Sequence, residues 1–223
     1  MVRMVIGLKQ FVVIGLGRFG SSLARTLYGL GHDVLAVDKK EEAVQEISES
    51  VTHAVQADAT DENTLRSLGL RNFDVAIVAI GSNIQSSILI SLIVKELGIK
   101  HVVAKAQSEL HAKLLYKIGA DRVVFPERDM GLRLAHNLVS SNVLDFIELS
   151  SDYSIVEVVA LDEWKGKTLK DLNFRRKYGL NVIAIKHNGE MNVSPKAEDI
   201  IEENDVLVVI GDNEGIARLE NKA

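Results

Sequence analysis

Three glycines near the N-terminus, Gly15, Gly17 and Gly20, have the spacing of a phosphate-binding loop. They directly follow an apolar run at residues 11–14 and open a segment of helical length. The first glycine permits a tight turn, the second lets the main chain approach a pyrophosphate, and the third lets the helix pack closely on the strand. Such a motif alone could be an ordinary glycine turn. Its place between a strand and a helix, whose free N–H groups attract phosphate, favours a nucleotide site.

Two charged residues indicate which kind of nucleotide the site would bind. Asp38 ends the apolar run 34–37, eighteen residues after Gly20, where its carboxylate can accept from both ribose hydroxyls and repels a 2′-phosphate. NADP is therefore less favoured than NAD, ATP or ADP. Arg18 is either a solvent-exposed cation or a ligand of a terminal phosphate, because a guanidinium matches phosphate oxygens. A dehydrogenase needs no cation there, so we favour the phosphate role.

Polar residues recur where later strands end. Asp58 follows the third strand, Asn83 follows the fourth, and Lys105 ends the fifth. Asp58 and Asn83 can cap the next helices as well as bind a ligand, whereas a lysine facing the crevice favours a binding role. The predicted nucleotide-binding set in this part of the chain is Gly15, Gly17, Arg18, Phe19, Gly20, Asp38, Lys39, Asp58, Ala59, Ile80, Gly81, Ser82, Asn83 and Lys105.

Glu127 follows Pro126 just after the sixth predicted strand. It either compensates a helix dipole or binds a divalent cation, Mg²⁺ or Ca²⁺, near the phosphates, since hard cations prefer carboxylate oxygen. One carboxylate is not a complete metal site. The phosphates or a second subunit would have to supply the other ligands.

The elements that position these residues alternate as strand and helix. Continuous apolar runs predict strands covered on both faces, as in a parallel sheet, at residues 10–15, 33–38, 53–57, 74–80, 101–106 and 122–125. A helix at 18–30 aligns Phe19, Leu23, Leu27 and Leu30, and Thr60 is the expected N-cap of a later helix. The fold class is α/β, a Rossmann doubly wound parallel sheet.

The pattern changes after residue 126. One long amphipathic helix is predicted at 127–141, and beyond it strands at 145–149, 154–160, 181–187, 190–193 and 205–211, with turns at 187–189 and 203–205 and helices at 168–177 and 213–220. This is a small α+β domain. We expect domains at 9–143 and 144–223, and the second is small enough that pairing with another copy would stabilise it.

Composition excludes several classes. The net charge of −5 argues against nucleic acid, and the absence of cysteine excludes disulfides and thiolate chemistry. No apolar run reaches the ~20 residues that span a bilayer. Arg3 and Lys9 beside an apolar run superficially suggest a signal peptide, but a cleavage site is missing and the run supplies a strand, so export is not expected.

Catalytic groups are not recognisable. The histidines show no metal-ligand spacing and no nearby orienting acid, so each is expected at or near the surface: His32, His53, His101, His111, His136 and His187. The C-terminal part also leaves little room for a substrate domain. We therefore predict a non-enzymatic regulator, and an NAD-dependent oxidoreductase is the alternative.

Seven short motifs in order resemble the KTN/RCK domains that regulate potassium conductance, and in particular the cytosolic gating subunits of bacterial Ktr potassium-uptake systems. They lie at residues 11–20, 38, 57–60, 78–85, 103–106, 118–121 and 126–127, and the likeness extends from about residue 9 to the end of the chain. Residues 1–8 have no assigned role. A subunit of a Trk-type transporter or a tethered channel would share the fold, although Trk-type chains usually carry two such domain pairs.

The resemblance implies an octameric ring of dimers on the cytosolic face of a dimeric membrane pore protein for potassium. ATP and ADP would compete for the Rossmann cleft, Arg18 would contact the terminal phosphate, and Glu127 would help bind a divalent cation at a dimer interface. The C-terminal domain of this family can bind cyclic di-AMP between two copies, and Arg175 and Asn181 match positions associated with it. Arg176 stands where a small residue is expected, and a basic surface cluster at 175–177 is the alternative.

Overall fold

The computed structural model describes residues 7–139 and 142–220. The chain divides into two units, Met1–Pro126 and Glu127–Ala223, and each is described by itself. Arg3 and the last two residues of the predicted helix 127–141 lie outside the described residues.

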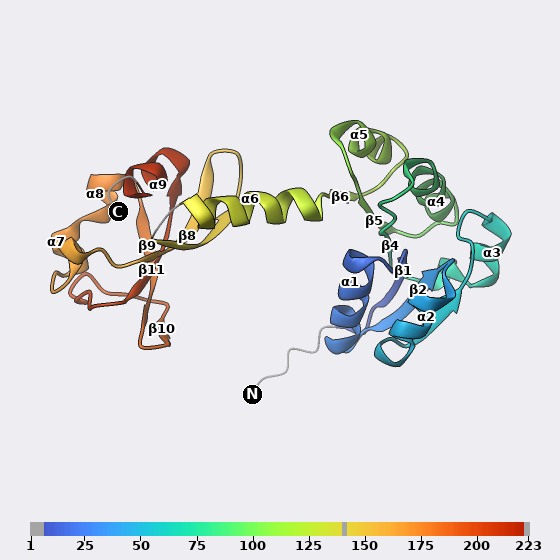
Figure 1. Cartoon of the computed structure of the whole chain (residues 1–223), viewed down its shortest axis with the longest axis horizontal. Coiled ribbons are helices and arrows are strands. Elements are labelled where there is room, and N and C mark those ends of the chain that lie inside the picture. The colour runs from blue at the N-terminus through green and yellow to red at the C-terminus, as the bar shows by residue number, and fades with distance from the viewer. Residues whose placement is uncertain (1–6, 140–141, 221–223) are drawn as a thin grey trace. The chain divides into compact units, whose positions relative to one another are not determined.

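The first unit is built on a six-stranded parallel sheet (Figure 1). Its strands are β1 (Gln10–Ile14), β2 (Asp33–Asp38), β3 (His53–Gln56), β4 (Val75–Val78), β5 (His101–Lys105) and β6 (Arg122–Val124). Their order in the sheet is β3-β2-β1-β4-β5-β6. The chain first adds β2 and β3 on one side of β1, and then returns to add β4, β5 and β6 on the other side. All six strands were predicted, and the doubly wound fold is confirmed.

Helices cover both faces of this sheet. Helices α1 (Arg18–Gly29) and α2 (Glu41–Ile47) pack on one face, where Val13, Ala36 and Ile77 meet Ala24 and Ile47. The opposite face packs against α3 (Glu62–Ser67), α4 (Ile84–Glu96) and α5 (Glu109–Lys117). Two short 3₁₀ turns, Ser48–Ser50 and Leu70–Asn72, complete the unit. Because both faces are buried, the strands read as continuous apolar runs.

Two local predictions in the first unit are wrong. Leu30 was placed on the buried stripe of α1, but it follows the last helical turn and is 68% exposed. Thr60 was expected to cap α3, but the cap is Asp61, whose side chain accepts from the Asn63 amide. The Thr60 hydroxyl donates instead to Asp58 at 2.6 Å, so it is already engaged in the preceding turn.

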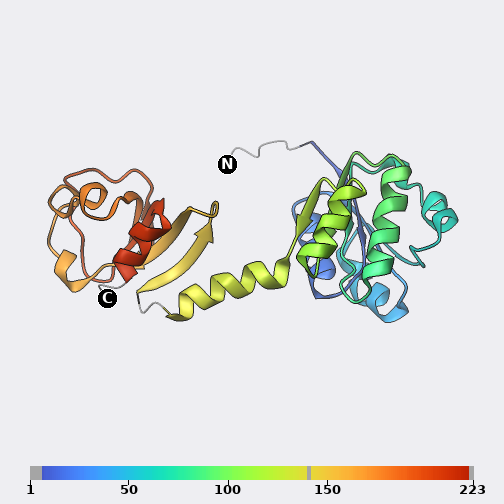
Figure 2. The ribbon, with the colours of Figure 1, turned by 90° about the horizontal axis from the view of Figure 1, so that it is seen from above.

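The second unit contains a five-stranded antiparallel sheet with the order β10-β9-β11-β8-β7. Its strands are β7 (Val143–Glu148), β8 (Tyr153–Val159), β9 (Asn181–His187), β10 (Glu190–Asn192) and β11 (Val206–Asp212). One face of the sheet carries α7 (Leu169–Leu172), α8 (Phe174–Tyr178) and α9 (Asn213–Glu220), and Figure 2 shows α9 in red against the strands. A 3₁₀ turn, Asp162–Trp164, buries the single tryptophan of the chain in this core.

The helix predicted at 168–177 is in fact two helices. Asn173 adopts a left-handed conformation with φ 45°, which ends α7 and begins α8. Asparagine tolerates this conformation better than most residues because its short polar side chain forms local hydrogen bonds. Leu172, Phe174 and Tyr178 are all buried. Residues two apart, such as Leu172 and Phe174, would lie on opposite sides of one continuous helix, so this spacing was a signal of the break.

The connecting helix α6 (Pro126–Val139) is tied to β7. Arg133 donates through two nitrogens to the Asp145 carboxylate, and the His136 ring stacks on Phe146 at 4.0 Å between centroids. The predicted boundary at 143 assigned α6 to the first domain, whereas the compact units group it with the second. The domain limits 9–143 and 144–223 stay a prediction.

Candidate nucleotide-binding site

The glycine loop forms a tight turn held by main-chain contacts. Gly15, at φ 98°, donates its amide to the Val37 carbonyl at 2.8 Å. A Cβ on Gly20 would lie 1.9 Å from the Gly15 carbonyl oxygen, so only glycine permits this approach of helix and turn. The conformation and packing of the loop therefore explain why the first and third positions of the motif are glycine.

The glycine at position 17 needs a different explanation. A Cβ built there would meet no described atom within 4 Å, so packing within the chain does not require glycine. Gly17 is the N-cap of α1, and the first turn of that helix carries Arg18, a cation, at the positive end of the dipole. Arg18 is exposed and forms no ion pair with any residue that the structure describes. An anion close to the Gly17 backbone would fit both features.

The loop lies at the switch point of the sheet, where β1 has β2 on one side and β4 on the other. A Cβ on Gly15 would lie 3.0 Å from Ile80 Cγ1, so the end of β4 directly borders the loop. Ligands of doubly wound sheets bind in this crevice at the carboxyl ends of the strands. The structure thus brings the glycine loop and residues 80–83 together.

Asp38 ties β2 to the loop. Its Oδ2 accepts from the Leu16 amide at 2.6 Å and its Oδ1 accepts from the Lys40 amide at 2.9 Å. A carboxylate has about four lone-pair sites, so both oxygens can still accept from a ribose. The neighbouring Lys39 is exposed, and its carbonyl accepts from Gln56 Nε2 at 3.2 Å.

Polar residues that follow β3 and β4 form local hydrogen bonds that fix the turns after these strands. Asp58 accepts from the Thr60 hydroxyl and amide, and these hydrogen bonds hold the pKa of Asp58 below its usual value. Asn83 caps α4 by accepting from the Ser86 amide at 2.9 Å. Capping and ligand binding were both predicted for Asn83, and the capping role is confirmed. Asp58 keeps a charged carboxylate at the crevice.

The remaining predicted residues divide by exposure. Ala59 is buried in one core, so mainly its main chain could meet a ligand. Phe19 is partly buried against the other core. Ser82 is exposed. The Lys105 ammonium lies 3.2 Å from where a Cβ on Gly81 would be, which places a cation over the turn that follows β4.

His111 was expected near the surface, and this is wrong because the side chain is 1% exposed. Its Nδ1 accepts from the Gln107 amide at 3.4 Å, and its Nε2 has no hydrogen-bond partner among the described residues. Burial lowers the pKa of His111. The result is a neutral imidazole at the start of α5 with an unmet N–H group, a feature that no spacing rule could have identified.

Glu127 lies in the first turn of α6 and is exposed. Among residues 7–139 and 142–220, no three His, Asp or Glu side chains gather to hold a metal ion. A cation at Glu127 would therefore need ligands from a bound phosphate or from a second copy of the chain.

The two candidate residues of the second unit are both exposed. Arg175 lies on α8, and Asn181 begins β9 opposite Ile210 of β11. Gly179, at φ 79°, ends the helix between them. Arg176 is exposed as well, so its larger side chain occupies no core space.

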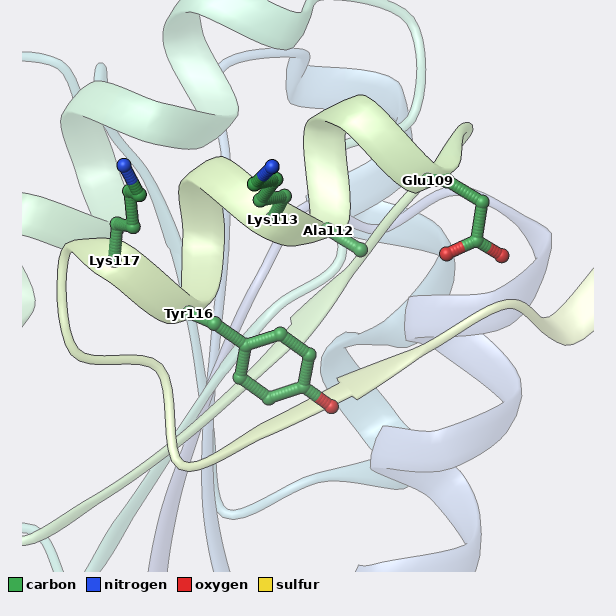
Figure 3. A pocket seen from close by; sticks show the side chains of 5 residues that line it. All are labelled: Glu109, Ala112, Lys113, Tyr116 and Lys117. Atoms are coloured by element: carbon green, nitrogen blue, oxygen red, sulfur yellow. The ribbon is translucent and has the colours of Figure 1, made fainter.

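A surface hollow of about 520 Å³ lies along α5, lined by Glu109, Ala112, Lys113, Tyr116 and Lys117 (Figure 3). All five side chains project from this one helix, so they do not converge on a ligand from different sides. None of the five belongs to the predicted nucleotide-binding set. The switch point, not this hollow, remains the candidate site.

Comparisons with known proteins define the class first. Residues 11–126 match the TrkA-N domain family and residues 153–223 match the TrkA-C domain family. Among solved structures, the GsuK channel superimposes with a TM-score of 0.68 at 20% identity, covering 96% of this chain and 39% of that one. The GsuK RCK domain gives a TM-score of 0.65 at 22% identity, covering 97% of this chain and 48% of that one. These matches support the fold.

Closer relatives define the family. The Ktr system potassium uptake proteins C and A of Bacillus subtilis (strain 168) are each 53% identical over 96% of this chain, covering 97% and 96% of their own lengths. The Ktr system potassium uptake protein A of Vibrio alginolyticus is 40% identical, covering 96% of this chain and 97% of its own length. The chain belongs to the family of Ktr system potassium uptake proteins built from a TrkA-N and a TrkA-C domain.

This family confirms the resemblance seen in the sequence. These relatives are named as potassium uptake proteins and not as enzymes, which agrees with the prediction of a regulator and gives the oxidoreductase alternative no support. Over the described ranges 7–139 and 142–220, none of the helices has the length and apolar character needed to cross a membrane.

Proposed function

We propose that the chain is the regulatory subunit of a Ktr-type potassium uptake system that binds ATP or ADP at the switch point of its first sheet. The observation that carries this proposal is the N-terminus of α1, where open space at Gly17 adjoins the exposed Arg18. A cation at the positive end of a helix is unfavourable without an anion nearby. A nucleotide with a charged terminal phosphate satisfies both groups.

Each residue at the crevice then has a role. The main chain at Gly17 receives the phosphates, Arg18 contacts the terminal phosphate, and Asp38 accepts from the ribose. Lys105 adds positive charge over the turn at Gly81. NAD is a weaker candidate because its pyrophosphate has no terminal phosphate for Arg18.

The nucleotide acts by changing the balance between two conformations of an assembly. A ligand shifts such a balance only by its different affinity for the two states. The assembly is a ring of dimers, an octamer, at the inner face of the cell membrane, in contact with a potassium pore subunit. Glu127 contributes to a divalent cation site that phosphates or a second copy complete.

The second unit binds a second signal, cyclic di-AMP, between two copies. Arg175 and Asn181 are exposed and available to an anionic dinucleotide. Calorimetric titration of the full chain with cyclic di-AMP tests this role, with Arg175→Ala as the variant and Lys186→Ala as the matched control. Equal heats for both variants would count against Arg175, and no heat with the unaltered dimer would count against the site.

The deciding experiment is a binding titration of the full chain with ATP, ADP and NADH. Binding of ATP and ADP at micromolar concentration, with weaker binding of NADH, is expected. Failure to bind either adenine nucleotide would refute the proposal. Preferential binding of NADH with turnover of a carbonyl substrate would support the alternative, an NAD-dependent oxidoreductase. Co-purification with a Ktr pore subunit, but not with a Trk-type pore, tests the partner.

A further inference from the structure

A polar cluster in the second unit joins two segments that are distant in sequence. His187, the last residue of β9, places its Nδ1 2.7 Å from Asp205 Oδ1. The Asp205 Oδ2 accepts from the Glu202 amide at 2.8 Å. The cluster therefore connects the β9–β10 hairpin to the turn that leads into β11. It also corrects the expectation that no histidine has an acid nearby.

Burial makes the Asp205 carboxylate dependent on its partners. Its side chain is 2% exposed, whereas that of His187 is 43% exposed. A buried carboxylate is stable only when it is paired or hydrogen-bonded. Beyond one main-chain amide, the hydrogen-bond partner of the Asp205 carboxylate among the described residues is the His187 imidazole, so the charge on His187 decides whether Asp205 has a counterion.

The charged groups around His187 are mainly acidic. Glu202 Oε2 lies 3.4 Å from its Nε2, and Glu190 stands opposite it on β10. The nearby Lys165 pairs with Asp162 and Glu203, at 2.8 Å from each. On its own strand, Lys186 is the preceding residue and, by strand alternation, points to the other face. The hydrogen bond to Asp205, supported by the charges of Glu202 and Glu190, raises the pKa of His187.

The environment accepts either protonation state of the ring. Asn188 Nδ2 lies 2.9 Å from Nε2, which suits a neutral ring with its proton on Nδ1. When Nε2 is protonated, Glu202 or the oxygen of a rotated Asn188 amide can accept from it. Asn188 and Gly189 have φ values of 47° and 89°, so the turn itself is already set without the ring.

We propose that His187 and Asp205 form a proton-operated clip that fastens the β9–β10 hairpin to the turn before β11. A histidine whose folded pKa exceeds its unfolded value stabilises the folded state fully below about pH 6.5. That contribution is lost as pH rises through the folded pKa. The clip is therefore closed in mild acid and weakened in mild alkali. The clip lies at the turn end of the hairpin, where His187 is opposite Glu190.

The test is an NMR titration of histidine ring protons in the full chain between pH 5.5 and 9, with His187→Gln to assign the signal. The His187 midpoint is expected above about 6.5 and should fall toward that value in Asp205→Asn. His53→Gln, a change at an exposed position in the other unit, is the control and should leave the His187 midpoint unchanged. An unchanged His187 midpoint in Asp205→Asn would overturn the clip.

A second measurement covers the case in which Asp205→Asn does not fold. The fluorescence of Trp164, the single tryptophan and fully buried in this unit, reports thermal unfolding of the second unit. Between pH 6 and pH 8.5 the unaltered chain should lose about 4 °C in midpoint relative to His187→Gln. If the unfolding midpoints of the unaltered chain and of His187→Gln changed equally with pH, the proposal would be overturned, whether or not Asp205→Asn folds.

Discussion

The polar groups of the two units are organised in different ways. In the first unit the candidate ligand groups are main-chain amides and residues at strand ends, placed by the tight turn at Gly15 and Gly20. In the second unit the polar cluster consists of side chains, His187, Asp205 and Glu202, from segments that meet only after folding. A site made by the main chain depends on glycine geometry, whereas a cluster made by side chains depends on charge.

The two units also differ in how a histidine responds to protons. Burial lowers the pKa of His111 in the first unit, whereas a carboxylate raises the pKa of His187 in the second. Between about pH 5 and pH 8, falling pH should therefore weaken the first unit and strengthen the second. Four predictions test how the two units are built and how they differ, in order of decreasing effect.

The largest effect is expected for Gly20→Ala. The added Cβ would meet the Gly15 carbonyl at 1.9 Å, so the loop must open, at a cost of about 3 kcal/mol to the first unit. Circular dichroism in urea should show the loss, while Trp164 fluorescence from the second unit stays unchanged. Gly17→Ala is the control, because its Cβ would meet no described atom within 4 Å. It should affect nucleotide binding and lower stability far less, by the loss of glycine at the N-cap alone. Equal destabilisation by both changes would contradict the assigned geometry.

The next effect is on ligand choice. Arg18→Ala should reduce the preference for ATP over ADP by about ten- to a hundredfold, since a charge-assisted hydrogen bond contributes roughly 1.5–3 kcal/mol. Without nucleotide, the variant should be as stable as the parent or slightly more stable, because a cation is removed from a helix N-terminus. Calorimetry with both nucleotides measures the ratio, and Arg25→Ala on the same helix is the matched control. An unchanged ratio would refute the phosphate contact.

The third effect is acid sensitivity of the first unit. Because the folded pKa of His111 is lowered, the unfolded chain takes up a proton below about pH 6.5 that the folded unit does not. Stability of the first unit should fall by up to about 1.4 kcal/mol per pH unit there. Hydrogen exchange of the β1 and β4 amides measures it, and His111→Gln should remove the dependence. A slope that persists in this variant would assign it to other groups.

The smallest effect concerns the break between α7 and α8. Asn173→Ala places an ordinary side chain at φ 45° and should destabilise the second unit by about 1 kcal/mol. Asn173→Gly should be close to neutral because glycine adopts this conformation freely. Urea unfolding followed by Trp164 fluorescence compares the two. If alanine were tolerated as well as glycine, a continuous helix would be the better description.

The sequence predicted the first unit well because its strands are buried on both faces and its loop is specified by glycines. Residues 11–20 alone contain the strand, the turn and the helix start. The clip was not predictable, because His187 and Asp205 are eighteen residues apart and no local rule pairs them. Thr60 and Asp61 are both good caps, and the choice between them depended on the hydroxyl contact to Asp58.

The bond from the Leu16 amide to Asp38 has a kinetic consequence. This bond and the one from the Gly15 amide to the Val37 carbonyl hold the loop in its turn through the protein's own groups. Under the proposed function, a nucleotide would meet a loop that the chain itself positions, so association would not be slowed by a conformational step. Differences between nucleotides then lie mainly in how long each stays bound. Under the proposed competition of ATP and ADP, residence time at this loop would set how quickly occupancy follows the ratio of the two nucleotides.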